Sequence, residues 1–320
     1  MTPSLEHVTE PSSAAAFKTR DSVSYDAVAD QFERFTDLFS IPLARRAVAL
    51  AALAPGHRAL DVGTGTGIVA IEAAAAVVPG GQVVGVDLSD GMLTRARDKA
   101  ARSGRSEAVE FRRMDAEILD LAEGSFDTVL SLFALLHFPD PIAALREMNR
   151  VLRPGGRLVV GVGSGAPLFT LAGWRHLLRR APELLQRLQG RYLAAPDFLD
   201  ALVEKRFPMR ADTAPARLAP RPHHGPRSVP ALVARAGFTD IRVEWEAHEG
   251  RLETAEDFFV LQKTYSSLAR KRLQDAPQDK VAALTGEFFE RCNAVLSRGG
   301  RLAYPYAALF VTARKLGGRG

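Results

Sequence analysis

The chain has 320 residues, 47% of them apolar, which provides enough nonpolar surface for a sizeable buried core. It has no run of 18 apolar residues and no continuous apolar stretch near its N-terminus, so we expect neither a membrane span nor a secretory signal, and a cytoplasmic location. Its 42 Lys and Arg exceed its 37 Asp and Glu to give a net charge of +5, but the charges are interspersed, which argues against a nucleic-acid partner. The single cysteine, Cys292, excludes an intrachain disulfide.

The N-terminal part of the chain predicts a tail followed by helices. Residues 1–20 mix Pro, Ser, Thr and Ala without periodicity, which is typical of a disordered segment. From Asp21 to Leu53 the apolar residues recur at helical spacing, with an interruption at Pro42. We therefore expect two helices here that lead into the core.

Five apolar runs then alternate with helix-like stretches. Runs at this spacing indicate repeated strand–helix units and a parallel sheet that is buried on both faces. The predicted strands are residues 58–62, 82–87, 109–114, 126–133 and 157–163. Together with the preceding helices they define a core over residues 21–163.

Residues 164–228 depart from this alternation. An amphipathic helix is predicted at residues 174–191, and the Pro- and Arg-rich residues 211–230 that follow cannot be regular structure for long. We expect this stretch to form a helical, Pro-rich lid over a substrate. Residues 229–316 would complete the sheet, with helices predicted at 231–237 and 253–273 and strands at 239–248 and 307–315.

A glycine-rich turn, LDVGTGTG, follows the first predicted strand. Ligands of parallel sheets bind beyond the carboxyl ends of the strands. Gly63, Gly65 and Gly67 would let the backbone turn tightly there and bring bare amides to a ligand at the start of a helix. The dinucleotide-binding pattern G-x-G-x-x-G would need a glycine at position 68, where the chain has Ile68, so this pattern is absent.

Three carboxylates accompany the glycine turn. Asp61 precedes the first glycine, Asp87 ends the second predicted strand and Asp115 follows the third. A carboxylate at the position of Asp87 can accept hydrogen bonds from both hydroxyls of a ribose, and one at Asp115 can accept a bond from an adenine amino group. Three acidic side chains disfavour a phosphate-rich ligand and favour a nucleoside that carries positive charge.

The ordered series of motifs resembles the class I S-adenosylmethionine-dependent methyltransferases, in the quinone-methylase-like (type 11) branch that includes many small-molecule and natural-product enzymes. The resemblance runs from about Tyr25 to Lys315 and rests on LDVGTGTG (60–67), VVGVDLSDGML (83–93), MDAE (114–117), SFDTVLSLFALLHFPDP (125–141) and REMNRVLRPGGRLVV (146–160). It implies an α/β fold, doubly wound and Rossmann-like, with a seven-stranded, mostly parallel sheet and a helical lid insertion after the fifth strand. It also implies S-adenosyl-L-methionine as cofactor and S-adenosyl-L-homocysteine as product.

The resemblance assigns roles to individual residues. Gly63, Thr64 and Gly65 would line the methionine half of the cofactor, with Gly67 in the same turn and Asp61 near the amino group. The other implied contacts are Asp87 with the ribose, Leu88 and Met92 with the nucleoside, Asp115 and Ala116 with adenine, Ser131 and Leu132 with the sulfonium, and Tyr25 with the carboxylate.

His137 is the predicted catalytic base, because it follows the fourth strand and so would lie beside the transferred methyl group. Some relatives have two histidines here, and this chain has Leu136 at the first position, so a structural role for His137 stays open. His223 and His224 lie in the Pro-rich segment, where they are either surface-loop residues or are carried inward by a lid. These two and Cys292 lack the spacing of zinc ligands, so we expect no metal.

The acceptor is predicted to be small and largely apolar, such as a polyketide-like, terpenoid or quinone-like molecule that is methylated on oxygen or carbon. One wall would be a lid, with Phe169, Leu171, Trp174, Leu177 and Phe198, and another would be the N-terminal helix, with Phe32, Phe35 and Phe39. The alternative is that these residues form a simple helical core.

Three other functions are compatible with parts of the sequence. A quinone-ring C-methylase would share the fold, and so would a cyclase or a binding protein that keeps its cofactor intact. A nucleic-acid methyltransferase is disfavoured, because the chain has SLFALLHF where amino-methylating enzymes have an NPPY-like motif.

Overall fold

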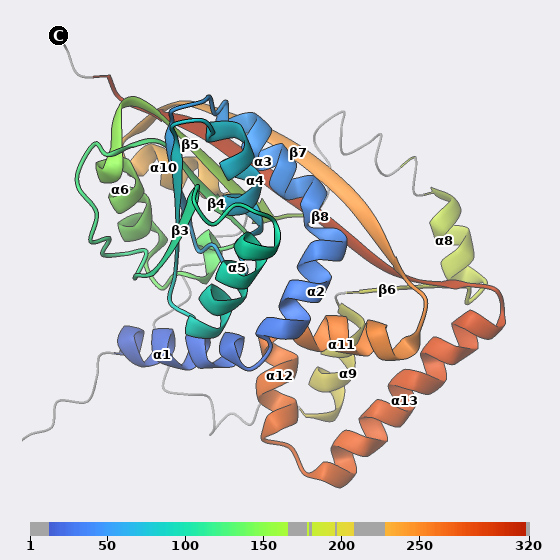
Figure 1. Ribbon diagram of the computed structural model, residues 1–320. Coiled ribbons are helices and arrows are strands. Elements are labelled where there is room, and N and C mark those ends of the chain that lie inside the picture. The colour runs from blue at the N-terminus through green and yellow to red at the C-terminus, as the bar shows by residue number, and fades with distance from the viewer. Residues whose placement is uncertain (1–12, 166–177, 179–180, 196, 208–227, 318–320) are drawn as a thin grey trace, which may run out of the picture.

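The computed structural model describes residues 13–165, 178, 181–195, 197–207 and 228–317. A central sheet of eight strands has the order β3-β2-β1-β4-β5-β8-β6, and β7 pairs with β8 (Figure 1). Strands β1 to β5 are parallel, whereas β8 runs antiparallel to both β5 and β7. The strands are β1 Arg58–Val62, β2 Gln82–Asp87, β3 Val109–Arg113, β4 Phe126–Leu132, β5 Leu152–Gly163, β6 Tyr192–Ala194, β7 Phe238–Leu252 and β8 Arg301–Lys315.

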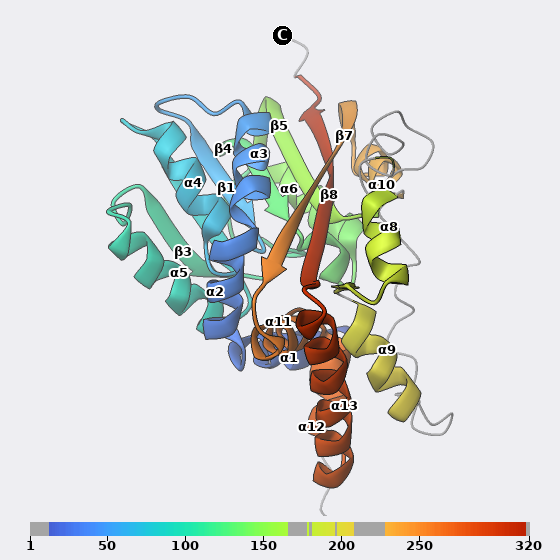
Figure 2. The same ribbon diagram turned by 90° about the vertical axis from the view of Figure 1, so that its right-hand side faces the viewer.

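Helices cover both faces of the sheet, as the apolar composition of its inner strands requires (Figure 2). On one face, α3 (Ile41–Ala51), α4 (Ile68–Val77) and α5 (Asp90–Arg102) bury an alanine-rich core that allows close approach of helix and strand. On the other face, α6 (Pro141–Val151) and α10 (Val229–Arg235) pack on β1, β4 and β5. The sheet is therefore doubly wound.

The long antiparallel strands β7 and β8 extend the sheet toward a helical subdomain, to which the helices between these two strands belong. These strands pair from Phe238 to Leu252, well beyond the carboxyl end of β5, and we call the part from Trp245 to Leu252 with its partners the hairpin arm. The arm ends in a helical subdomain whose core contains Phe258, Leu284 and Phe288. Its helices are α9 (Asp197–Arg206), α11 (Ala255–Tyr265), α12 (Ser267–Gln274) and α13 (Gln278–Ser297), and α2 (Ala29–Phe39) packs against them.

The predicted fold class is confirmed, with differences at the edges. All seven predicted strands are present, β1 and β2 with the predicted bounds, and the three-residue β6 is an additional strand. The helical interruption near Pro42 is also present, because α2 ends at Phe39 and Pro42 occupies the first turn of α3, where its missing N–H is not needed. The expected disordered tail is wrong over residues 13–20, which belong to helix α1 (Ser13–Asp26).

Only part of the expected lid falls within the described residues. There, α9 buries Leu199, Leu202 and Val203 in the helical subdomain, so this part of the insertion is subdomain core. Helix α8 (Ala181–Leu188) leaves Leu185 and Leu188 exposed at 58% and 79%. The remaining candidates lie outside the described residues: Phe169, Leu171, Trp174, Leu177, His223 and His224. Among the helices described, none is long and apolar enough to cross a membrane.

Candidate functional site

A cavity of about 750 Å³ lies at the carboxyl ends of β1, β2, β4 and β5, between helix α1 and the hairpin arm. We divide it in two. The strand-end half is lined by residues that follow β1 to β4 and by the side chains of α1 that face them. The aromatic half is lined by Phe32, Trp245, His248, Tyr265, Tyr304 and Tyr306.

The glycine turn connects β1 to α4 and forms the floor of the strand-end half. Gly63, Gly65 and Gly67 all have positive φ, at +72°, +53° and +81°, a conformation that side chains rarely adopt. A Cβ atom on Gly63 would lie 2.2 Å from the Cβ of Ala134, whereas one on Gly65 would have no neighbour nearer than 3.9 Å. Space for a ligand therefore adjoins Gly65.

Gly67 and Ser131 do not line the cavity, in contrast to the sequence prediction. A Cβ on Gly67 would lie 2.8 Å from Phe111, so this glycine is required for packing at the start of α4. Ser131 is buried within β4, and its Oγ has no hydrogen-bond partner among the described residues. The neighbouring Leu132 does line the cavity.

Asp87 is held by backbone amides of the glycine turn and of the turn that follows β2. Its Oδ2 accepts a hydrogen bond from Gly65 N–H at 2.9 Å, and its Oδ1 accepts one from Ser89 N–H at 3.0 Å. Burial raises the pKa of Asp87, although these bonds oppose the shift. A ligand that donates further hydrogen bonds would restore the preference for the carboxylate.

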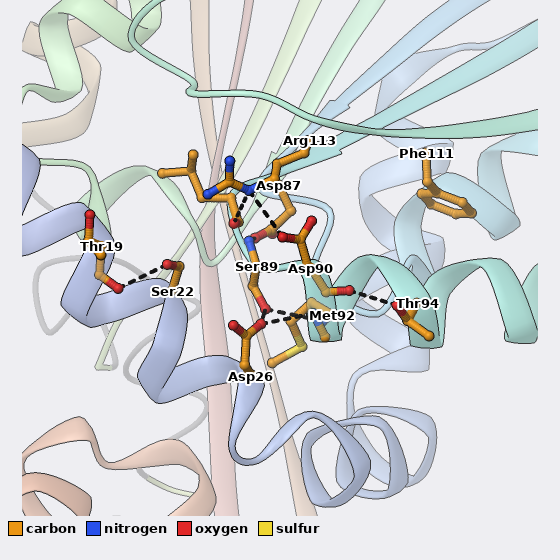
Figure 3. A network of polar contacts seen from close by, with 12 residues as sticks. Thr19, Ser22, Asp26, Asp87, Ser89, Asp90, Met92, Thr94, Phe111 and Arg113 are labelled. Atoms are coloured by element: carbon orange, nitrogen blue, oxygen red, sulfur yellow. Dashed lines mark hydrogen bonds and ion pairs between the residues drawn. The ribbon is translucent and has the colours of Figure 1, made fainter.

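Helix α1 is bound to this strand end through Asp26 (Figure 3). Asp26 Oδ1 accepts hydrogen bonds from Ser89 Oγ at 2.6 Å and from Gly91 N–H at 2.8 Å. Ser89 Oγ in turn accepts from Met92 N–H and so caps α5. The same capping turn positions Leu88 and Met92, which both line the cavity.

Asp61 is a buried carboxyl group that has no cationic partner in the part of the chain that the structure describes. It accepts a hydrogen bond from Thr64 Oγ at 2.7 Å, and burial raises its pKa to about 7. A positively charged group in the adjoining cavity would favour the carboxylate form. The strand-end half is therefore suited to a ligand with a cationic group near Asp61.

Asp115 lies at the other end of the strand-end half, where it is paired with α1. Lys18 Nζ donates to Asp115 Oδ2 at 2.7 Å and to Glu117 Oε2 at 2.6 Å. Burial lowers the pKa of Lys18, but the bonds to both carboxylates outweigh this effect and raise it overall. Ala116 lines the cavity beside this cluster. The sequence prediction missed Lys18, because it placed that residue in a disordered tail.

Tyr25 and His137 are neighbours in the lining of the cavity. The Tyr25 ring contacts His137 edge to face at 6.3 Å and Phe32 at 6.0 Å between centroids. His137 follows β4, as the motif predicts, and it ends the short 3-10 helix η1 (Leu135–His137). Burial raises the pKa of Tyr25 to about 12, so the phenol stays neutral.

The aromatic half was missed by the sequence prediction except for Phe32. Phe35 and Phe39 are buried in the helical subdomain, and Phe198 packs on Phe288 with centroids 5.0 Å apart, so these three do not line the cavity. The residues that do line it come from α11 and the hairpin arm. In the sequence, the two tyrosines of the segment Tyr304–Tyr306 are the feature that could have indicated them. Among the described residues, no group of three or more His, Cys, Asp or Glu side chains is arranged to hold a metal ion.

The doubly wound sheet, its glycine turn and the carboxylates at successive strand ends define a nucleoside-binding α/β protein. Residues 60–160 match the methyltransferase domain family. Nocamycin O-methyltransferase of Saccharothrix syringae is 30% identical over 290 residues, which cover 91% of this chain and 94% of that enzyme. The chain belongs to the class I S-adenosylmethionine-dependent methyltransferases, in the type 11 branch, and S-adenosyl-L-methionine is its cofactor.

Two further comparisons define the extent of the similarity. The ubiquinone/menaquinone biosynthesis C-methyltransferase UbiE of Teredinibacter turnerae is 36% identical over 140 residues, which cover 42% of this chain and 56% of that enzyme. A solved structure from Bacillus halodurans, of a protein assigned as a methyltransferase, covers 85% of this chain and 98% of its own, with a TM-score of 0.50 and 21% identity. That likeness supports the fold alone.

Proposed function

We propose that this methyltransferase acts on a small, largely apolar molecule and methylates it on a hydroxyl or enol oxygen. The observation that carries the proposal is the single cavity in which the strand-end half opens directly into an aromatic half. A half lined by aromatic side chains is suited to a small apolar ligand. Among the described residues, the Lys and Arg side chains that line the cavity are limited to Lys18, which is paired with Asp115 and Glu117, so this lining does not suit a nucleic acid backbone.

The extent of the two enzyme matches supports oxygen over a quinone ring carbon as the acceptor atom. Phe32 and Tyr306 both line the aromatic half. The 140-residue match to UbiE is shorter than the stretch of chain between these two residues, so it cannot include both. The 290-residue match to the nocamycin enzyme is longer than that stretch. The more extensive likeness is therefore to an enzyme named for O-methylation.

We further propose that the strand-end half holds the cofactor, which supplies a methyl group activated on a sulfonium. Asp87 would accept from the ribose hydroxyls, Asp61 would neutralise the ammonium group, and Asp115 would accept from the adenine amino group in competition with Lys18. The remaining proposed contacts are Gly63, Thr64 and Gly65 with the methionine part, Tyr25 with its carboxylate, Leu88, Met92 and Ala116 with the nucleoside, and Leu132 with the sulfonium region.

The proposed role of His137 is to accept the proton of the reacting hydroxyl. Its position after β4, beside Tyr25, is at the boundary of the two halves, where an acceptor oxygen would approach the methyl group. The cavity walls would orient that oxygen and exclude water, effects that contribute up to about 7 to 11 kcal/mol in well-aligned reactions. A positioned base adds about 10²- to 10⁴-fold.

The test is to incubate the protein with cofactor labelled on its methyl group and with hydroxylated polycyclic acceptors, and to locate the label. Label in a methyl ether of the acceptor supports the proposal. Label on a ring carbon of a quinol would assign the protein to quinone C-methylation instead. A rearranged acceptor together with unconsumed cofactor would contradict methyl transfer.

A further inference from the structure

Four aromatic rings form a continuous column along the aromatic half. Tyr265 stacks on Tyr304 and Tyr304 stacks on Tyr306, each with centroids 5.5 Å apart, and Tyr306 stacks on His248 at 5.6 Å. All four residues line the cavity. The column is built from α11, β7 and β8, so it belongs to the hairpin arm and its helices.

The column is fixed from behind by Phe39. This buried ring contacts Tyr304 at 5.7 Å and Tyr306 at 6.3 Å between centroids. Gly250 of β7 makes room for it, because a Cβ there would lie 2.3 Å from the Phe39 ring. The rings are therefore held in place before any ligand enters.

Stacking determines which part of each ring a ligand can touch. Tyr304 and Tyr306 each stack with two neighbouring rings, which occupy part of their faces and leave their edges for a ligand. Ring edges carry partial positive charge and ring faces partial negative charge, so edge-to-face contacts are favourable. A row of tyrosine edges is thus complementary to the π face of a flat, unsaturated ligand.

His248 ends the column and supplies a directed polar group. Its Nε2 lies 2.7 Å from Glu246 Oε1, and Glu246 in turn lies 3.5 Å from Arg46 Nε. A neutral imidazole that donates from Nε2 to a carboxylate keeps Nδ1 as a hydrogen-bond acceptor. His248 is accordingly prepared to accept a hydrogen bond from a hydroxyl group.

The strand order separates His248 from His137, so we assign the two histidines different roles. The strand order places β5 and β8 between β4, which ends beside His137, and β7, which carries His248. Three strand spacings amount to roughly 14 Å. One ligand that touches both histidines must therefore be elongated.

We propose that the acceptor is a flat, unsaturated molecule of about two to three fused rings, with a second hydroxyl group at the end remote from the methylated oxygen, which donates a hydrogen bond to His248. This assignment deepens the proposed function and rests on it. His248 is a specificity-determining residue here, and Glu246 is a positioning residue that fixes its tautomer. The tyrosine column supports the ring plane between the two ends.

The experiment compares 2-hydroxyanthraquinone with 2,6-dihydroxyanthraquinone, two flat probes that differ in the remote hydroxyl. Binding of each is measured by calorimetry on the protein saturated with S-adenosylhomocysteine. We expect the dihydroxy probe to bind about tenfold more tightly, the effect of one hydrogen bond. In His248→Phe, which keeps a ring against Tyr306, the preference should disappear while the affinity for the monohydroxy probe is retained.

Glu246→Gln provides a second variant, and Glu244→Gln is its matched control, because Glu244 contacts Arg46 from the same strand but not His248. Glu246→Gln should reduce the preference about threefold, and Glu244→Gln should leave it unchanged. Equal binding of both probes to the unsubstituted protein would overturn the assignment, as would a preference that survives in His248→Phe. Failure of both probes to bind would also overturn this assignment of the acceptor. The proposed function would remain intact in that case if the protein still binds S-adenosylhomocysteine normally and transfers label to other acceptors.

Discussion

The two halves of the cavity are built in different ways. Apart from the side chains of α1, the strand-end half is made by short segments that each lie within a few residues of a strand end, so its glycines and carboxylates are close to a recognisable strand. The aromatic half is assembled from Phe32, Tyr265 and the pair of strands that carry Trp245 and Tyr306, which are far apart in the sequence. The half proposed to bind the cofactor is thus encoded locally, whereas the wall proposed to bind the acceptor depends on tertiary packing.

The largest effect expected at the boundary of the two halves is that of His137→Ala. If His137 accepts the acceptor's proton, turnover should fall by about 10²-fold or more. Calorimetry should find the affinity for S-adenosylhomocysteine almost unchanged, because the ring is not a proposed hydrogen-bond partner of the cofactor. His57→Ala, at a histidine near the start of β1, is the control. Near-normal turnover in His137→Ala would remove the base from this position.

Asp87→Ala tests the strand-end half alone. It should weaken binding of S-adenosylhomocysteine by roughly 1.5 to 3 kcal/mol, because hydrogen bonds to a charged group are lost and the amides of Gly65 and Ser89 lose their acceptor. Binding of aromatic probes to the other half should change little. The exposed neighbour Asp90 serves as control through Asp90→Asn. An unaltered cofactor affinity in Asp87→Ala would mean that the ribose is held elsewhere.

The contrast between the halves also explains what the sequence could predict. The bounds of β1 and β2 could be predicted because each strand is a buried apolar run. The turn after β1 could be predicted because its backbone has positive φ values, which favour glycine. Gly67 fits the same motif, yet its purpose is close packing against Phe111. A motif identifies the residues that a turn needs without distinguishing contact with the ligand from contact with the core.

Helix α1 and the hairpin arm could not be predicted for a related reason. No apolar stripe marks residues 13–26 as a helix, and α1 is held by charged contacts from Lys18 and Asp26 to residues about 63 to 99 positions away. Likewise, the stacking of His248 on Tyr306 depends on the register of β7 with β8, which composition does not specify. Tertiary partners determine both elements.

The pH dependence of cofactor binding should separate Asp61 from the rest of the site. The pKa of about 7 in the free protein means that the carboxyl group becomes protonated as the pH falls below neutral, and a protonated Asp61 cannot neutralise an ammonium group. Affinity for S-adenosylhomocysteine should therefore fall about fivefold from pH 7 to pH 6. Asp61→Asn should bind weakly at both pH values and show a flat profile, whereas Asp90→Asn should keep the slope. A steep profile in Asp61→Asn would assign the titration to another group.

The smallest effect is expected from Lys18→Met, which tests how α1 closes the strand-end half. The ion pairs of Lys18 are partly exposed, with side-chain exposures of 18%, 27% and 13% for Lys18, Asp115 and Glu117, so they are screened and contribute about 0.2 to 1 kcal/mol. Their loss should make proteolytic cleavage within α1 about two- to threefold faster, because cleavage requires local opening. Affinity for S-adenosylhomocysteine should stay within about twofold, because two effects oppose each other. Helix α1 is held less firmly, but the adenine amino group no longer competes with Lys18 for Asp115. Lys280→Met, at an exposed position of α13, is the control. Unchanged cleavage of Lys18→Met would mean that Asp26 and the ring of Tyr25 suffice to hold α1, and that the contact with Asp115 adds nothing to closure.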